Sequence, residues 1–129
     1  MNTAIVGLGS NIAPQGNIKK AREGLAKYYR VLAESPFVRT KPIGSLLQAD
    51  YLNGAVLLET RSGQQELLST LKAIERELGR RNLKKSFGPR TIDLDILVWN
   101  GKIVSPDVRK RRFVAESVVA LLPELQQQI

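Results

Sequence analysis

Residues 91–104 read TIDLDILVWNGKIV and carry the clearest structural signal in the chain. Polar and apolar residues alternate from Thr91 to Ile96, which is typical of a strand with one buried face. Asn100-Gly101 is a pair strongly favoured in two-residue hairpin turns, because both turn positions need a positive φ angle. The stretch therefore predicts a strand over residues 91–99 that pairs with a short strand over residues 102–104.

A second alternating stretch, Tyr51 to Thr60, predicts another strand. Leu52, Val56 and Leu58 share the face that we expect to be buried. The opposite face carries Tyr51, Asn53, Ala55 and Leu57. After this strand, Ser62 and Gln65 have the spacing of a capping box, and a helix is expected from there until Gly79 ends it.

The order of the predicted elements decides the fold class. Ala4 to Gly9 predicts a buried strand, and a helix is expected from an N-cap at Asn17. A β-rich composition returns at residues 29–37, a loop spans residues 40–50, and a short helix is expected at residues 113–122. The order β-α-β-β-α-β predicts an α+β, ferredoxin-like plait, with a mostly antiparallel sheet and helices on one face. We treat residues 1–129 as a single domain and expect the open sheet face to carry the function.

The composition narrows the possible chemistry. The 129 residues include no cysteine and no histidine, which excludes disulfides, cysteine nucleophiles and Ser-His catalysis. Acid–base or metal chemistry then falls to carboxylates, lysine, tyrosine or water. The lack of cysteine, of a signal peptide and of a long apolar run leads us to expect a cytoplasmic protein without a membrane partner. The oligomeric state stays open.

Positive charge is concentrated in one part of the sequence. The formal net charge is +8, and more than half of the Lys and Arg residues lie between Arg76 and Arg112. A basic patch favours a polyanionic partner, such as nucleic acid, a phospholipid surface or a nucleotide polyphosphate. The alternative is a solvated helix face and loop.

Two aspartates in the predicted strand carry the sharpest chemical signal. Asp93 and Asp95 point away from the apolar face formed by Ile92, Leu94, Ile96 and Val98. Their attachment points lie about 7 Å apart, so the carboxylates can converge and raise each other's pKa unless a cation neutralises them. Oxygen ligands of this kind suit Mg²⁺, which also takes phosphate oxygens. The alternative is that both aspartates pair with neighbouring arginines.

Two further groups of residues complete a candidate site. The segment from Arg80 to Arg90 is rich in Lys and Arg, and as a flexible loop it could fold over a triphosphate; a solvated loop is the alternative. A flat heterocycle could bind to Tyr51 and Asn53 and to the loop from Thr40 to Gly44, with Phe113 as a second ring. The alternative is that these are ordinary surface residues. The chain has neither a third fingerprint glycine after Gly9 nor a Walker-type phosphate loop. It also lacks the aromatic cluster of RNA-binding plaits, which argues against a nucleic-acid partner.

These stretches together resemble a known family. The matching blocks are Gly7-Leu8-Gly9-Ser10-Asn11, Arg39-Thr40-Lys41-Pro42-Ile43-Gly44, Asp50-Tyr51-Leu52-Asn53-Gly54-Ala55-Val56, Ile74-Glu75-Arg76-Glu77-Leu78-Gly79-Arg80 and Gly88-Pro89-Arg90-Thr91-Ile92-Asp93-Leu94-Asp95-Ile96-Leu97. In this order they resemble 6-hydroxymethyl-7,8-dihydropterin pyrophosphokinase of folate biosynthesis. The resemblance implies a ferredoxin-like fold and transfer of pyrophosphate from ATP to the pterin hydroxymethyl group, with release of AMP.

The resemblance also implies roles for individual residues. Asp93 and Asp95 would hold two Mg²⁺ ions, and Arg80 and Arg90 would be the catalytic cations that neutralise the transferred group. The pterin pocket would consist of Thr40, Pro42, Ile43, Tyr51, Asn53 and Phe113. The nucleotide side would consist of Glu75, Lys84, Lys85, Phe87, Ile96 and Arg111. Positioning and electrostatics drive this type of transfer, so a chain without histidine is compatible with it.

The chain departs from the family pattern at three places. Asn82 stands where the family has a second loop arginine, and Ser86 replaces a further basic residue. The family's Pro-His segment is absent, and the cluster from Arg109 to Arg112 is a hypothetical substitute for it. Two alternatives therefore stay open: a relative that binds pterin or nucleotide without turnover, and a basic plait that binds RNA.

Overall fold

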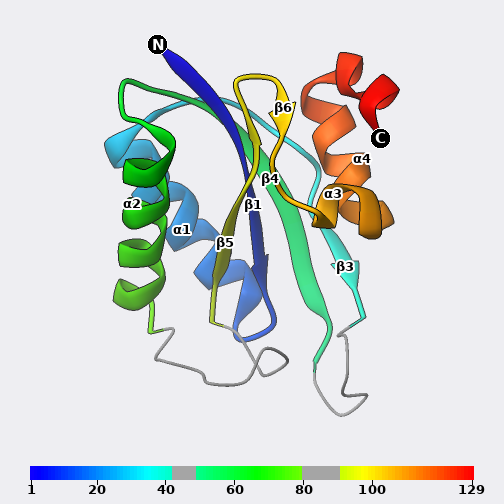
Figure 1. Cartoon of the computed structure of the whole chain (residues 1–129). Coiled ribbons are helices and arrows are strands. Elements are labelled where there is room, and N and C mark those ends of the chain that lie inside the picture. The colour runs from blue at the N-terminus through cyan, green and yellow to red at the C-terminus, as the bar shows by residue number, and fades with distance from the viewer. Residues whose placement is uncertain (42–48, 80–90) are drawn as a thin grey trace.

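The computed structural model describes residues 1–41, 49–79 and 91–129 of the chain. Figure 1 shows the arrangement of the strands and helices. The elements are β1 (Asn2–Ser10), α1 (Pro14–Tyr28), β2 (Arg30–Glu34), β3 (Val38–Thr40), β4 (Tyr51–Thr60), α2 (Gln64–Glu77), β5 (Asp93–Trp99), β6 (Lys102–Ile103), α3 (Asp107–Lys110), α4 (Arg112–Leu121) and the 3-10 helix η1 (Pro123–Gln128).

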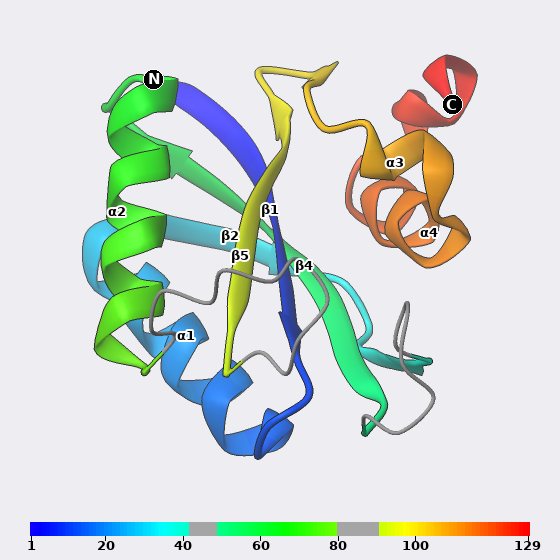
Figure 2. The same cartoon turned by 60° about the horizontal axis from the view of Figure 1, so that its bottom comes forward.

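The strands form one antiparallel sheet in the order β2-β4-β1-β5-β6, and β3 pairs with the start of β4. Helices α1 and α2 lie side by side on one face (Figures 1 and 2). Between them and the sheet lies the main core, which includes Val6, Leu25, Leu58, Leu71 and Leu94. This arrangement confirms the predicted ferredoxin-like plait.

The opposite face of the sheet is partly covered, although we expected it to be open. Helices α3 and α4 lie on this face (Figure 2), and their Val108 and Val118 pack with Ile5, Ala55 and Leu97 of the sheet. In the first half of β1 both faces carry apolar residues: Ala4 and Val6 on one, Ile5 on the other. The helices α3 and α4 cover the second face because this buries its apolar side chains. Within the described parts of the chain, the end of this face with the second half of β1 and the starts of β4 and β5 is left for a site.

A β-bulge in β5 corrects one predicted side-chain direction. Val6 pairs with Ile96 and Ile5 pairs with Val98, so Leu97 is an extra residue between two pairs. A bulge shifts the alternation of the strand after it. As a result Val98 packs with the second cluster, on the face of α3 and α4, and not with Ile92 and Leu94 as predicted.

The turns confirm two predictions from glycine. Gly79 ends α2 with a φ of +94°, and Asn100 and Gly101 turn the hairpin with φ angles of +48° and +79°. These are left-handed conformations, which glycine and asparagine adopt most readily.

The starts of the helices differ from the predictions. Helix α1 begins after Ala13, and Asn17 lies in its first turn, where the side-chain amide donates to the carbonyl of Ile12. Helix α2 has its N-cap at Gly63, whose N–H donates to Glu66 3.2 Å away, so the capping pair is one residue later than predicted. Ser62 instead bonds the hydroxyl of Thr60, and this local bond displaces the cap. Within the described residues, no helix has the length and apolar character needed to cross a membrane.

Candidate active site

A cleft of about 160 Å³ lies on the sheet face opposite α1 and α2, beside the C-terminal helices. Its floor comes from β1, β4 and β5, and its walls come from residues 40–41 and from α3 and α4. The lining residues are Gly7, Leu8, Gly9, Thr40, Lys41, Tyr51, Asn53, Gly54, Asp93, Asp95, Leu97, Asp107, Arg111, Phe113, Val114 and Ser117. The cleft thus unites the predicted aspartates with several residues predicted for a ring pocket.

The two aspartates stand at alternate positions of β5, as predicted. Asp93 pairs with Gly9 and Asp95 with Gly7 of the central strand, so no β1 side chain stands beside either carboxylate on this face. Burial raises the pKa of Asp95 to about 7, and the negative charge of Asp93 adds to the effect. A cation beside these two side chains would offset the cost of burying the charge and the repulsion from Asp93, so it would lower this pKa and displace the proton.

The donor set fits a magnesium ion that also binds a substrate. Mg²⁺ prefers oxygen ligands and commonly uses one or two carboxylates together with phosphate oxygens and water. Within residues 1–41, 49–79 and 91–129, no three acidic side chains gather closely enough to hold a metal ion by themselves. Asp93 and Asp95 would therefore share the ion with a ligand that brings its own oxygens.

The pairing of β3 with β4 brings together three of the residues predicted for a ring pocket. Thr40 pairs with Tyr51, and the Thr40 hydroxyl accepts a hydrogen bond from the side-chain amide of Asn53. Across the sheet Gly9 pairs with Asn53, and a Cβ atom at Gly9 would lie only 2.7 Å from Asn53 Oδ1. Only glycine leaves room for this amide. The sequence analysis did not assign Gly9 to the site, although an isolated glycine inside a strand often marks a close approach.

The C-terminal helices close the cleft from the other side. Phe113, in the first turn of α4, is half-buried in the cleft, and its carbonyl accepts a hydrogen bond from the buried Ser117 hydroxyl. Arg111 also lines the cleft, with its Nε 3.7 Å from Asp107 Oδ1. The sequence analysis missed Asp107, for which the only signal was an acidic residue beside four cations.

Two residues predicted for the nucleotide side lie around the edge of β5, toward the helices. Glu75 is 2% exposed, accepts a hydrogen bond from the Leu94 N–H at 2.7 Å, and has Oε1 3.3 Å from Lys72 Nζ. Ile96 packs against the main core. Neither residue lines the cleft, so a nucleotide role for them stays a prediction. Other predicted site residues lie outside the described residues: Pro42, Ile43, Arg80, Lys84, Lys85, Phe87 and Arg90.

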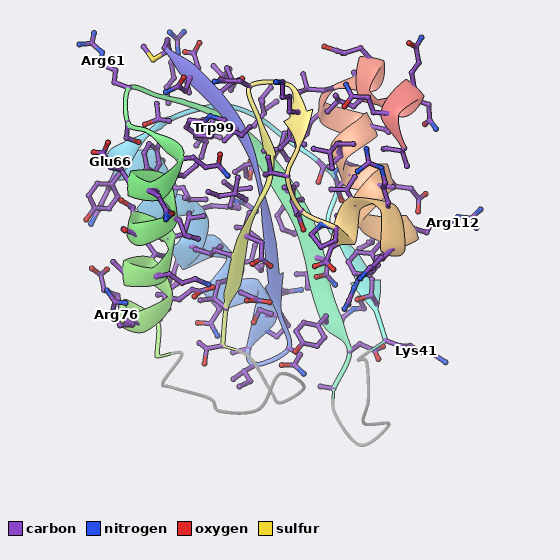
Figure 3. The ribbon with its side chains drawn as sticks, in the orientation of Figure 1. Lys41, Arg61, Glu66, Arg76, Trp99 and Arg112 are labelled. Carbon is purple, nitrogen blue, oxygen red and sulfur yellow. The ribbon has the colours of Figure 1, made fainter. Side chains whose placement is uncertain are left out.

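The basic stretch does not form one patch in the described parts of the chain. Arg76 extends from the end of α2, whereas Arg112 extends from α4 on the opposite side of the sheet (Figure 3). The intervening sheet separates these cations, which sequence distance alone does not reveal. The prediction of a single patch is wrong for them.

The plait and its cleft define a class of α+β protein in which a cleft on the sheet lies beside a pair of carboxylates. Within this class, the chain belongs to the 7,8-dihydro-6-hydroxymethylpterin-pyrophosphokinase (HPPK) family, whose model matches residues 5–123. This finding confirms the family expected from the motifs.

Relatives from several bacteria and a plant support the assignment. The chain is 39% identical to the 2-amino-4-hydroxy-6-hydroxymethyldihydropteridine pyrophosphokinase of Methylorubrum extorquens, over 95% of this chain and 80% of the relative. It is 36% identical to the protein of the same name from Synechocystis sp., over 94% of this chain and 67% of the relative. It is also 35% identical to the folate synthesis bifunctional protein of Arabidopsis thaliana, over 92% of this chain and 26% of that protein.

Proposed function

We propose that this protein transfers a pyrophosphoryl group from ATP to the hydroxymethyl group of 6-hydroxymethyl-7,8-dihydropterin. The hydroxymethyl oxygen forms a bond to the β-phosphorus of ATP and loses its proton to water. The bond from that phosphorus to the α–β bridging oxygen breaks, and AMP leaves. The observation that carries the proposal is the cleft that joins the Asp93–Asp95 pair to the pocket of Tyr51, Asn53 and Phe113. The family and the names of its relatives support it.

The pterin ring binds between Tyr51 and Phe113, with Asn53 and Thr40 at its polar edge. Aromatic faces suit a flat ring, and an amide held by a neighbouring hydroxyl presents a fixed hydrogen-bonding edge. Pro42 and Ile43 complete this pocket in the proposal. Tyr51 belongs to β4 and Phe113 to α4, so the proposed ring site lies between the sheet and the helix that covers part of this face.

By family resemblance, Asp93 and Asp95 would hold two Mg²⁺ ions beside the polyphosphate. Bound Mg²⁺ would neutralise part of the polyphosphate charge and so reduce the repulsion that an oxygen nucleophile meets as it approaches phosphorus. Arg80 and Arg90 neutralise the transferred group, and Arg111 contacts the nucleotide from the junction between α3 and α4. The remaining nucleotide-side residues are Glu75, Lys84, Lys85, Phe87 and Ile96. The cytoplasmic location stays a prediction from the sequence.

The cleft argues against the RNA alternative. Among the charged residues that line it, Asp93, Asp95 and Asp107 outnumber Lys41 and Arg111, and carboxylates repel a phosphate backbone that brings no divalent cation. No contact among the described residues and no comparison favours the other alternative, a relative that binds pterin or nucleotide without turnover.

The decisive experiment measures AMP formed from ATP, Mg²⁺ and the hydroxymethylpterin. We expect the wild-type protein to form AMP only when the pterin is present, and Asp95→Asn to lower kcat by about 100-fold or more, as loss of a key electrostatic group does. Glu23→Gln is the matched control, because Glu23 is an exposed carboxylate on α1. A folded wild-type protein that forms no AMP above background would overturn the proposal and favour the non-catalytic relative.

A further inference from the structure

The turn after β1 joins the two halves of the cleft. Strand β1 pairs with β4 on one side and β5 on the other, and the end of β1 lies beside the starts of both (Figure 1). Its last residue, Ser10, is followed by Asn11. Both side chains are buried, at 0% and 7% exposure, although they are polar. Buried polar side chains nearly always form hydrogen bonds, so the partners of these two show what the turn holds together.

Ser10 fixes the start of β5. Its hydroxyl donates to the carbonyl oxygen of Thr91 at 2.6 Å, and the carbonyl oxygen of Ile12 is a second, longer acceptor at 3.1 Å. The backbone pairing of β1 with β5 ends at Gly9 and Asp93, so this bond extends the connection two residues beyond the ladder. The segment that it holds leads directly into Asp93 and Asp95. Ser10 therefore acts on the carboxylate side of the cleft without lining it.

Asn11 fixes the approach to β4. Its side-chain amide donates to the carbonyl of Ala49 at 3.2 Å. Ala49 precedes Tyr51 by two residues, and Tyr51 and Asn53 form the ring side of the cleft. Two adjacent side chains thus tie both halves of the cleft to the same corner of the sheet.

We propose that Ser10 and Asn11 are positioning residues that set the distance between the carboxylate pair and the ring pocket. The inference rests on the proposed function, in which a transfer joins two substrates bound to different strands. Such a transfer depends on alignment, and a displacement of about 1 Å can cost about 100-fold in rate. Loss of either hydrogen bond should therefore harm the joint step more than the binding of either substrate alone.

The test uses Ser10→Ala, which removes the hydroxyl, and Asn11→Asp, which removes the donor at almost unchanged size. We expect each variant to lower kcat by about tenfold or more. The dissociation constants for the pterin alone, and for Mg²⁺ with a non-hydrolysable ATP analogue alone, should change by less than about threefold. Should Ser10→Ala fail to fold by circular dichroism, Asn11→Asp carries the test.

Ser35→Ala is the matched control. Ser35 is also a buried serine, 5% exposed, and its hydroxyl accepts the Ala55 N–H at 2.8 Å. It bonds β4 from the side away from β1, so its loss should lower the melting temperature to a similar degree but leave kcat within about twofold. This comparison separates positioning from general loss of stability.

Amide hydrogen exchange gives a readout that does not depend on activity. We expect faster exchange at the amides of residues 91–95 in Ser10→Ala, and no such change in Ser35→Ala. Unchanged exchange in Ser10→Ala, or a kcat loss no greater than that of Ser35→Ala, would overturn the inference. The proposed function would still stand if the wild type forms AMP. A wild-type protein that forms no AMP would overturn both.

Discussion

At the scale of single residues, the missing side chain of Gly9 shapes the cleft as much as any side chain that is present. Gly9 lies in the central strand between Asn53 on β4 and Asp93 on β5. A methyl group there would lie 2.7 Å from Asn53 Oδ1, closer than real contacts allow. The amide of Asn53 also donates to Thr40, so a shift of Asn53 would break that bond as well.

Gly9→Ala should therefore weaken pterin binding while the fold persists. We expect the dissociation constant for the pterin to rise by about tenfold or more, which corresponds to the loss of roughly one good hydrogen bond. Binding of a magnesium–nucleotide analogue should change much less. The measurement is titration calorimetry with each ligand separately. Gly16→Ala is the control, because a Cβ at Gly16 meets no atom within 4 Å. Equal pterin affinity in Gly9→Ala and wild type would contradict the role assigned to Gly9.

At the scale of elements, helix α4 positions Phe113 for the proposed ring pocket, as β5 positions the two aspartates. It supplies Phe113 and Ser117 to the cleft, and the second hydrophobic cluster holds it on the sheet through the fully buried Val118. The position of Phe113 thus depends on packing that lies outside the cleft itself.

Val118→Ala should separate this packing from the chemistry. Loss of two buried methyl groups costs roughly 1–3 kcal/mol of folding stability, because a cavity remains. We expect the KM for the pterin to rise several-fold with a smaller change in kcat, since Phe113 loses its fixed support. Val56→Ala removes the same groups from the main core and should lower stability similarly without raising that KM. A KM for Val118→Ala equal to that of Val56→Ala would refute the idea.

The elements also show how far the sequence alone could lead. Regular signals predicted the strand from Tyr51 to Thr60, the hairpin at Asn100-Gly101 and the aspartate pair, because these depend on local periodicity and turn chemistry. The second cluster was not predictable, since Ile5, Ala55 and Leu97 become buried only when helices distant in sequence dock on them. The bulge at Leu97 has the same origin: period-two reasoning carries no signal for an inserted residue. Within the site, Asp107 and the close approach of Gly9 to Asn53 depend on tertiary contacts in the same way.

At the scale of the whole molecule, the cleft lowers the stability of the protein that contains it. Burial, together with the charge of Asp93, raises the pKa of Asp95 from 3.8 to about 7. Between these two values the folded state binds a proton that the unfolded state has lost. Stability from this group is therefore fully present below pH 4 and declines as the pH rises toward 7.

Asp95→Asn should remove this decline. The amide does not titrate, so in the absence of Mg²⁺ the variant should gain stability over wild type as the pH rises from 4 to 7.5, by roughly 2–4 kcal/mol. Urea unfolding at pH 4, 5.5 and 7.5 measures the difference, and Glu23→Gln provides the baseline for an exposed carboxylate. Addition of Mg²⁺ with a non-hydrolysable ATP analogue should stabilise the wild type more at pH 7.5 than at pH 5.5, because protonated Asp95 is a poor ligand. Parallel pH profiles for wild type and Asp95→Asn would show that Asp95 is already ionised in the free protein. In that case the ionised Asp95 would not lower the free energy of unfolding, and the idea that the cleft destabilises the fold would be wrong.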